Sequence, residues 1–345
     1  MTVLSVAYPF ARVSSDSIGG AEQIAASLDR SLVLTGHRSI VIAAAGSEIL
    51  GELVSVPVPA GIITESTRAE AERHHRRTID EVLARERVDI VHCHGLDFFR
   101  YLPEARVPVL ATLHLPISFY PREIFSVNRP DTWLHCVSAS QQQDCPTSAM
   151  LLPPIPNGVD IPRQFKTIRR DGFALALGRI CPEKGFHLAI DAARQAAVPL
   201  ILGGAVYPYQ THIEYFEKEI CPRLDDDRVF AGALARAQKL KLMAQARCLL
   251  IPSLVAETSS LVAMEALASG LPVIAFPAGA LADTVEHGRT GFLVSNMEEM
   301  SAAIRETDRI DRRVCRRTAL QSFSSETMFR SYLAAYRAAI RKSAL

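Results

Sequence analysis

Residues 248–270 read Cys248-Leu-Leu-Ile-Pro-Ser-Leu-Val-Ala-Glu-Thr-Ser-Ser-Leu-Val-Ala-Met-Glu-Ala-Leu-Ala-Ser-Gly270. The apolar run 248–251 has the length and composition of a buried strand. Residues 258–260 are suited to the N-cap position of a helix, and Gly270 is suited to its C-terminal end. A helix is therefore predicted between them. A buried strand that leads through a short loop into a helix is the repeating unit of a parallel sheet covered by helices.

The same alternation of apolar runs and amphipathic stretches extends over most of the chain, in two halves. Three prolines within 152–160 and the polar stretch 163–171 separate the halves, because proline cannot lie in a central strand. We therefore predict an α/β protein with two doubly wound parallel sheets. The predicted strands are 2–7, 39–44, 88–92, 109–113 and 133–137, then 173–177, 200–202, 229–231, 248–251, 273–276 and 292–294.

Length and composition agree with two globular domains. The 345 residues contain 38 Lys+Arg and 37 Asp+Glu, a formal net charge of +1, so no overall field attracts nucleic acid or anionic lipid. The seven cysteines form no CxxC pair, which favours reduced thiols. The N-terminus lacks the features of a signal peptide, and prolines and glycines interrupt the most apolar stretch, 261–282. These features predict a cytoplasmic protein.

The domain boundaries follow from the proline-containing and polar segments that separate the two halves. We assign residues 1–160 to an N-terminal domain and 161–324 to a C-terminal domain. The final segment, 325–342, places Phe329, Tyr332 and Tyr336 on one helical face, which requires a surface to cover.

The loop after strand 173–177 is the first candidate site, because ligands of such sheets bind at the carboxyl ends of the strands. It reads Gly178-Arg-Ile-Cys-Pro-Glu-Lys-Gly185. With Pro182 at a first helical position, Lys184 falls in the first turn, where the helix dipole disfavours a cation by about 0.3–1 kcal/mol. Either Lys184 is a solvated lysine, or Arg179 and Lys184 converge on a phosphate.

The loop after strand 248–251 is the second candidate site. Glu257 precedes the predicted helix, and Glu265 lies inside it among apolar residues. A carboxylate in such surroundings requires a partner. The partner is either an arginine in an ion pair or the hydroxyl groups of a ligand.

Glu257 and Glu265, with the following Ala-Leu-Ala-Ser-Gly-Leu-Pro-Val-Ile, resemble the paired-glutamate motif of retaining glycosyltransferases of the GT-B fold, family 4 type. Other segments agree with that family in the same order and cover nearly the whole chain. They are Gly19-Gly-Ala-Glu22, Val88-Asp-Ile-Val-His-Cys-His-Gly95, Leu113-His114, Pro156-Asn-Gly-Val-Asp160, Gly178-Arg179 with Lys184-Gly185, Gly279 and Gly291-Phe-Leu-Val294.

The resemblance implies two Rossmann-like domains that face each other across a cleft, with the helix of 325–345 crossing back to complete the first. It implies retaining, metal-independent transfer of a sugar from a UDP- or GDP-sugar, without a cofactor, to an unidentified hydroxyl acceptor. It also implies a role for each matched residue. Glu257 contacts the donor sugar, Glu265 the ribose hydroxyls, and Arg179 with Lys184 the diphosphate. The amides of Ser260, Leu261 and Val262 support the same phosphates. Gly178, Gly19 and Gly20 also belong to the donor site, and His114 faces the reacting sugar.

Two departures from the family pattern concern the donor pocket. Ser259-Ser260 replaces the usual aromatic-glycine pair, and Ala280 replaces the second glycine of a pair. A non-catalytic scaffold or subunit partner of GT-B fold therefore stays open as an alternative. A dinucleotide-dependent oxidoreductase is disfavoured, because neither half has a first strand leading into G-x-G-x-x-G.

Other chemistry-bearing residues favour structural roles. Asp225-Asp-Asp227 precedes a strand and is more consistent with a solvated turn than with a metal site. His92 and His94 project from the same side of a strand but lack a third ligand, and His74-His75 indicates a polar helix face. The segment 309–317 is basic enough for peripheral membrane contact to be considered. Its basic residues alternate with acidic ones, however, which favours a solvated helix.

Overall fold

The computed structural model describes residues 1–345 except 18, 59–63, 163–171 and 344–345. Its contacts divide the chain into two compact units, Met1–Asn157 with Met328–Leu345, and Gly158–Thr327. The segment 163–171, which the sequence placed at the domain junction, lies outside the described residues. Among the helices that are described, none has both the length and the apolar character needed to cross a bilayer.

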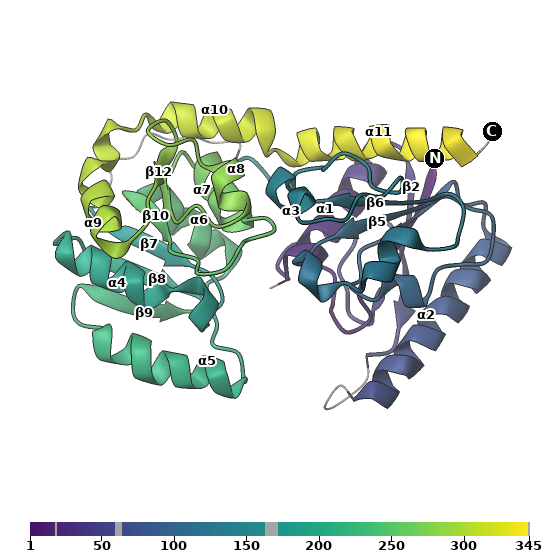
Figure 1. The fold of residues 1–345 in the computed structure, drawn as a ribbon, viewed down its shortest axis with the longest axis horizontal. Coiled ribbons are helices and arrows are strands. Elements are labelled where there is room, and N and C mark those ends of the chain that lie inside the picture. Colours follow the sequence, from purple (N-terminus) through teal and green to yellow (C-terminus); the bar gives the residue numbers. More distant parts are fainter. Residues whose placement is uncertain (18, 59–63, 163–171, 344–345) are drawn as a thin grey trace. The chain divides into compact units, whose positions relative to one another are not determined.

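The first unit contains a six-stranded, fully parallel sheet in the order β3-β2-β1-β4-β5-β6 (Figure 1). The sequence analysis missed its edge strand β3, because that strand is half exposed and mixes polar with apolar residues. The strands are β1 Thr2–Val6, β2 Arg38–Ala44, β3 Glu52–Val56, β4 Ile90–Cys93, β5 Val109–Leu113 and β6 Thr132–Cys136.

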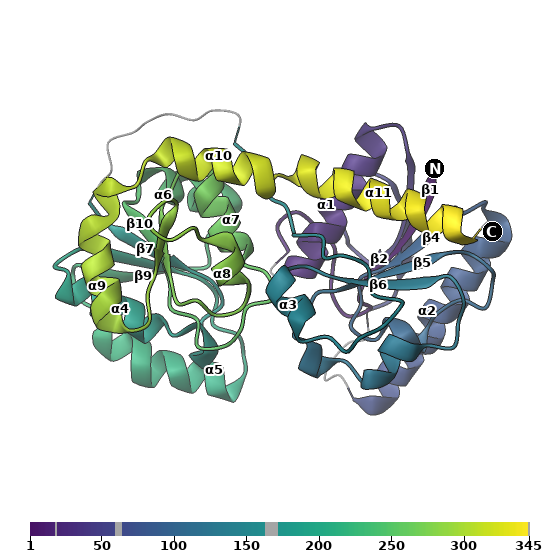
Figure 2. The same cartoon turned by 45° about the horizontal axis from the view of Figure 1, so that its top comes forward.

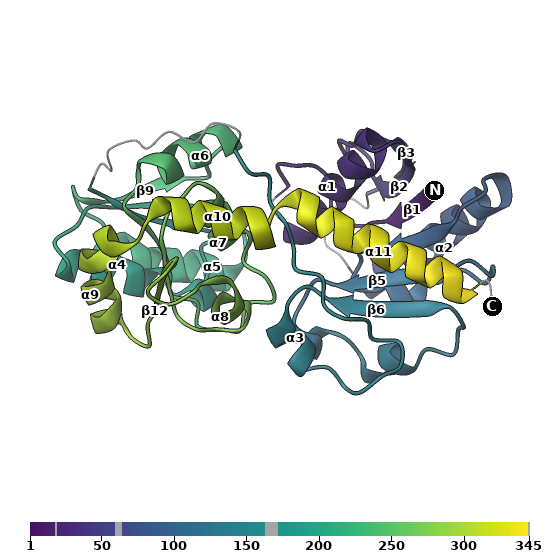
Figure 3. The same cartoon turned by 90° about the horizontal axis from the view of Figure 1, so that it is seen from above.

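Helices cover both faces of this sheet. Alternate strand residues such as Leu4 and Ile42 pack with Ile79 of α2 (Glu65–Arg85), whereas Val41 packs with Ala25 of α1 (Gly20–Leu34) on the opposite face. The short helix α3 (Ala139–Gln143) follows β6. The C-terminal helix α11 (Ser325–Ser343) lies over the sheet, as Figure 3 shows. The predicted return of this helix to the first domain is confirmed.

A buried polar network joins α11 to the sheet. His92 contacts the Tyr336 hydroxyl through Nδ1 and Thr112 Oγ1 through Nε2, both at 2.7 Å. Thr112 Oγ1 also lies 2.7 Å from His135 Nε2 and 3.2 Å from the Tyr332 hydroxyl. One assignment satisfies every contact: His135 Nδ1 donates to the Cys136 carbonyl, and both imidazoles are neutral. His92 is therefore a structural histidine.

Burial keeps these histidines neutral. It lowers the pKa of His135 to about 4 and of His94 to about 3, and it lowers the pKa of His92 well below its usual value. Burial also lowers the pKa of His75, on the inner face of α2, to about 4. The expectation of a polar helix face at His74-His75 is thus wrong for His75, whose Nε2 lies 3.2 Å from the Ala7 carbonyl.

We expect the folded protein to lose stability as the pH falls below about 6.5. The unfolded chain then takes up protons that the folded chain excludes, so each buried histidine removes up to about 1.4 kcal/mol per pH unit until the pH approaches its folded pKa. Denaturant unfolding between about pH 7.5 and 5 measures this slope before most carboxylates titrate. The exposed His287→Gln variant serves as the control with an unchanged slope. Equal stability at both ends of that range would refute the account.

The second unit repeats the design, with parallel strands in the order β12-β11-β10-β7-β8-β9. Helices α4 and α9 cover one face of its sheet, and α7 and α10 the other; Figure 2 also shows α8 on the α7 side. Its elements are β7 Ala174–Leu177, α4 Phe186–Gln195, β8 Leu200–Gly203, α5 Gln210–Tyr215, β9 Arg228–Gly232, α6 Arg236–Gln245, β10 Cys248–Ile251, α7 Leu261–Ala268, β11 Val273–Ala275, α8 Ala280–Thr284, β12 Gly291–Leu293, α9 Met297–Glu306 and α10 Arg312–Ser322.

Helix α10 corrects the expectation of a simple solvated helix in 309–317. The guanidinium of Arg312 is buried and donates to the Gly270 and Ala244 carbonyls at 3.0 and 2.9 Å. Arg316 donates to the Ala268 carbonyl at 2.9 Å. These arginines hold α10 against the C-terminal ends of α6 and α7 by donating to carbonyls at or just beyond those ends.

Candidate functional site

The two candidate loops follow adjacent strands at the centre of the second sheet. Strands β7 and β10 are neighbours, and the strand order reverses between them. The carboxyl ends of two such strands form the crevice in which open α/β sheets bind ligands. The loop 178–185 follows β7, and the loop 252–260 follows β10.

The loop after β7 differs locally from its prediction. Pro182–Lys184 is a separate 3-10 turn, and Gly185, in the left-handed region at φ 63°, precedes α4. Lys184 therefore lies just before the N-cap of α4 and not in its first turn, which corrects its predicted position. The physical reason is the positive φ of Gly185, which interrupts the helix.

Gly185 also lets this turn pack closely on the loop after β10. A Cβ at Gly185 would lie 2.2 Å from the Pro252 carbonyl oxygen. The Leu254 amide donates to the Glu183 carbonyl at 2.8 Å. These two contacts join the loops that carry Lys184 and Glu257.

Lys184 and Glu257 form a direct ion pair, 2.5 Å from Nζ to Oε1. Ser253, fully enclosed at the end of β10, donates its hydroxyl to the same oxygen. The Glu257 side chain is 11% exposed and that of Lys184 26%. The structure thus brings together two residues that the sequence assigned to the sugar and the diphosphate.

The backbone of Glu257 depends on Gly279. The Ala280 amide donates to the Glu257 carbonyl at 2.8 Å, and the Glu257 amide donates to the Ala278 carbonyl at 3.2 Å. Gly279 has φ 60°, and a Cβ there would lie 2.4 Å from the Glu257 carbonyl oxygen. Only glycine fits this approach, which fixes where Glu257 leaves the loop.

Glu265 has a cationic partner, which is a lysine and not the arginine of the ion-pair alternative. Lys239 of α6 lies 2.7 Å from the Glu265 carboxylate, and the two side chains are 21% and 14% exposed. The sequence could not identify Lys239 as this partner, because α6 is a polar helix that also carries other cationic residues. The pair neutralises Glu265 among the apolar residues of α7.

The N-terminus of α7 is a donor of hydrogen bonds. Ser260 occupies the N-cap position, and its side chain makes no capping hydrogen bond. The first amides of the helix, at Leu261 and Val262, have no acceptor within it. Ser260 is buried, and Ser259 has a buried hydroxyl with no partner among the described residues.

Arg179 takes no part in the Lys184–Glu257 and Lys239–Glu265 ion pairs. It is exposed, and its guanidinium lies 5.8 Å from the centre of the Tyr207 ring, a cation–π distance. Gly178, between β7 and Arg179, could not carry a Cβ without close contact to Phe186, at 3.2 Å. Arg179 and Lys184 therefore have different partners in this structure.

The first unit has its own switch point, between β1 and β4. Gly19 and Gly20 begin α1, and a Cβ at Gly19 would lie 1.9 Å from a carboxylate oxygen of Glu22. Burial raises the pKa of Glu22. Gly19 thus makes room for Glu22 at the start of α1; its predicted approach to a donor stays a prediction.

His114 directly follows β5 and is buried, with Nε2 3.1 Å from His94 Nδ1. Burial, then His94, lowers its pKa well below the usual value. Asp97 escaped the sequence analysis, and His94 was considered there only beside His92. His94 Nε2 and Asp97 Oδ2 are buried and have no partner in the described part of the chain, and burial raises the pKa of Asp97. Their position just after β4 was the available signal.

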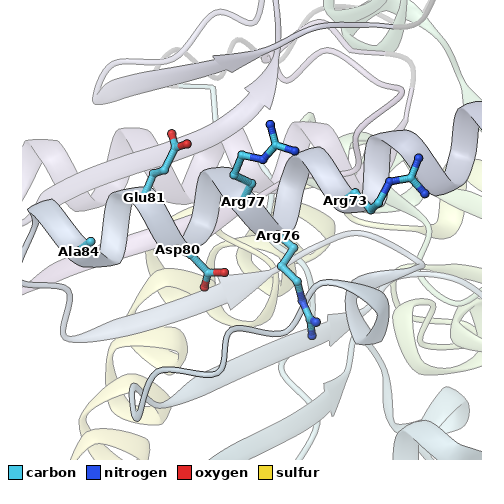
Figure 4. Close-up of a pocket in the computed structure, with 6 residues that line it drawn as sticks. All are labelled: Arg73, Arg76, Arg77, Asp80, Glu81 and Ala84. Carbon is cyan, nitrogen blue, oxygen red and sulfur yellow. The ribbon is translucent and has the colours of Figure 1, made fainter.

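A separate surface pocket lies on α2, as Figure 4 shows. It is open and shallow, and none of the predicted donor residues belongs to it. Arg76 already donates to the Leu102 carbonyl at 3.1 Å. Arginines and acidic residues alternate around it, so it has no strong charge preference; its lining is Arg73, Arg76, Arg77, Asp80, Glu81 and Ala84.

Two protein families match the chain in sequence. Residues 18–163 match the family described as Glycosyltransferase Family 4, and residues 173–307 match Glycosyl transferases group 1. The first match covers most of Met1–Asn157 and runs slightly past it, and the second lies within Gly158–Thr327.

Curated relatives are similar over part of their length. The lipopolysaccharide 1,2-N-acetylglucosaminetransferase of Salmonella typhimurium is 25% identical over 67% of this chain and 65% of its own. The D-inositol 3-phosphate glycosyltransferase of Kribbella flavida is 33% identical over 51% of this chain and 46% of its own. The matched segments thus span less than two thirds of either relative.

Solved structures share the fold. AviGT4, a glycosyltransferase of avilamycin A biosynthesis, is 22% identical with a TM-score of 0.73, covering 99% of this chain and 98% of its own. Anabaena HepE in complex with UDP and glucose is 21% identical with a TM-score of 0.76, covering 97% and 99%.

Proposed function

Because the chain belongs to the glycosyltransferases of family 4 and group 1, we propose that it transfers a sugar from a nucleoside diphosphate sugar to a hydroxyl group of an acceptor. The observation that carries this proposal is the Lys184–Glu257 pair at the switch point of the second sheet. It combines a cation suited to phosphate with a carboxylate suited to sugar hydroxyls. Structures of the same fold captured with UDP and UDP-glucose support UDP-sugars as the first donors to test.

The diphosphate would bind at the turn 178–185 and the start of α7. Arg179 is exposed and available, Lys184 is within reach of the loop after β10, and the first amides of α7 favour an anion. Binding exchanges the Lys184–Glu257 contact for a Lys184–phosphate contact. The energetic cost is modest, because Glu257 keeps the Ser253 hydroxyl as a partner.

The sugar and the ribose would bind the two glutamates. Glu257, released from Lys184, accepts hydrogen bonds from sugar hydroxyls, and Glu265 accepts them from the ribose. Lys239 balances the charge of Glu265 throughout. Ser253 positions the Glu257 carboxylate by donating a hydrogen bond to it.

We propose retention of configuration and independence of metal ions. Breaking the bond from the anomeric carbon to the phosphate oxygen leaves negative charge on the departing diphosphate. Arg179, Lys184 and the α7 amides stabilise that charge, which is the main requirement of the transition state. The acceptor oxygen forms the new bond on the same face, and its proton passes to the departing phosphate.

The acceptor would bind the first unit. His114, His94 and Asp97 present polar atoms at its switch point, and two of those atoms lack partners among the residues described. Sugars and other polyhydroxylated acceptors have the donors and acceptors to satisfy them. This assignment supports a polar acceptor.

A panel of UDP- and GDP-sugars tests the proposal in the presence of EDTA. We expect one donor to release nucleoside diphosphate, by transfer or slow hydrolysis, at a rate that chelation leaves within about twofold. Proton NMR of the initial product would then show the donor's anomeric configuration.

Three outcomes of the panel would count against the proposal. Loss of nucleotide binding in EDTA with recovery in magnesium or manganese would refute metal independence, and an inverted product would refute retention. Binding of every donor without turnover would favour the alternative of a non-catalytic scaffold, to which the Ser259-Ser260 replacement points.

A further inference from the structure

A cysteine, a glutamate and a histidine gather beside the turn that carries Lys184. The Cys181 sulfur, a Glu183 carboxylate oxygen and a His212 ring nitrogen all lie within 4.8 Å of one another. Glu183 is exposed, whereas Cys181 and His212 are buried. This set is the one group of three potential metal ligands found among the described residues.

The fold, and not the sequence spacing, brings these residues together. Cys181 and Glu183 belong to the loop after β7, and His212 belongs to α5. A parallel bridge between Ile180 and Val206 aligns the two chain segments, with the Ile180 amide donating to the Ala205 carbonyl at 3.0 Å. No CxxC or HxxxH pattern could have indicated the site.

His212 supplies an independent sign of a missing ligand. Its side chain is 8% exposed, and its Nδ1 is buried without a hydrogen-bond partner in the described chain. The rings of Tyr207 and Tyr209 flank it, at centroid distances of 6.2 and 5.1 Å. An unsatisfied buried nitrogen costs free energy that a bound cation would recover.

We propose that Cys181, Glu183 and His212 bind one thiophilic divalent cation of the zinc class per chain. Zinc takes sulfur, imidazole nitrogen and carboxylate oxygen as ligands, with three protein ligands and water completing a tetrahedron. Metal–ligand bonds of about 2.0–2.3 Å place the ligand atoms of a tetrahedral site about 3.3–3.6 Å apart. The three ligand atoms therefore reach bonding distance through small side-chain rotations, chiefly of the exposed Glu183.

Charge and proton balance agree with this assignment. On binding, the S–H bond of Cys181 breaks, a sulfur–metal bond forms, and the proton passes to solvent. Thiolate, carboxylate and neutral imidazole then carry two negative charges against the two positive charges of the cation, and the exposed Arg179 guanidinium is the neighbouring cation.

The cation would tie α5 to the turn Pro182–Lys184 and so hold the chain segment that presents Lys184. Its role is structural, and it is independent of whether the protein transfers sugar. Magnesium and manganese prefer oxygen ligands. Any loss of activity caused by stripping this cation with a chelator would therefore be reversed by zinc and not by magnesium or manganese, which separates this structural site from donor binding.

Titration of the full chain with Co²⁺ tests the proposal, because cobalt reports its own coordination. We expect one equivalent to bind with a thiolate-to-cobalt charge-transfer band and tetrahedral visible bands, and Zn²⁺ to displace it. Lowering the pH by one unit should weaken binding about tenfold, since one proton is displaced. Melting temperature should rise with Zn²⁺ and saturate at one equivalent.

Variants assign the ligands. Cys181→Ser and His212→Gln should each weaken Co²⁺ binding by at least about 10- to 100-fold, and Cys181→Ser should remove the charge-transfer band. Cys221→Ser, at an exposed cysteine of the same unit, is the matched control and should bind like wild type. Because Cys181 is buried and its variant could fail to fold, Glu183→Gln at the exposed ligand provides an independent test.

Three results would overturn the proposal. They are an absence of stoichiometric binding by the folded wild type, a cobalt spectrum without the thiolate band, and wild-type affinity in the folded His212→Gln and Glu183→Gln proteins. Each is measured without a sugar donor, so a failure here leaves the proposed transferase activity untouched.

Discussion

Glu257→Gln should lower sugar transfer by at least about 100-fold while nucleoside diphosphate still binds. Glutamine keeps the size of the side chain but loses the charge that strengthens hydrogen bonds from sugar hydroxyls. Two such bonds at about 1.5 kcal/mol each account for the effect. Lys184, freed from its ion pair, should bind free UDP up to about fivefold more tightly. Initial rates and calorimetric UDP titrations measure the two effects.

The control for this variant is Glu286→Gln, which removes a carboxylate from an exposed ion pair with Arg289. It should leave both transfer and UDP affinity unchanged. If Glu257→Gln instead weakened UDP and UDP-sugar equally, Glu257 would bind the nucleotide. An unfolded Glu257→Gln protein would make its role structural.

Lys184→Ala should weaken nucleoside diphosphate binding about 10- to 100-fold. A charge-assisted hydrogen bond to phosphate is worth about 1.5–3 kcal/mol, and alanine offers no substitute. The same change breaks the ion pair with Glu257, so the ligand-free protein should be slightly less stable, by no more than about 1 kcal/mol for this partly exposed pair. Calorimetry measures the affinity for nucleoside diphosphate, and thermal unfolding measures the stability of the ligand-free protein.

Lys218→Ala is the matched control, because Lys218 also pairs with a glutamate, Glu214 at 2.9 Å, but on an exposed helix face. Its nucleotide affinity should equal that of wild type. If Lys184→Ala bound nucleoside diphosphate with wild-type affinity, Lys184 would have only a structural role in the loop.

The sequence predicted the fold well because buried strands leave an unambiguous apolar signal. All eleven predicted runs coincide with strands of the structure. Strand β3 was missed, since an edge strand with exposed Glu52 and Ser55 does not show an apolar run. His75 was misjudged because neighbouring charges concealed that it faces the sheet. In both cases tertiary burial, and not local composition, decides the structure.

The candidate site was predictable where it depends on loops at strand ends. Glu257, Lys184 and Glu265 all lie in or beside the loops after β7 and β10. Their partners were not predictable: Lys239 and Ser253 approach through packing between elements, and Gly185 ends a turn where the pattern indicated a continuous helix. Pairings between distant segments leave no periodic trace in a single sequence.

The central claim is that Lys184 holds the diphosphate and Glu257 the sugar of one donor. Calorimetric titration of UDP and GDP into wild type, Lys184→Ala, Glu257→Gln and the double variant tests it most directly. We predict opposite effects: weaker binding in Lys184→Ala, unchanged or tighter binding in Glu257→Gln, and no tightening by Glu257→Gln once Lys184 is absent. Wild-type affinity for both nucleotides in all three folded variants would contradict the account.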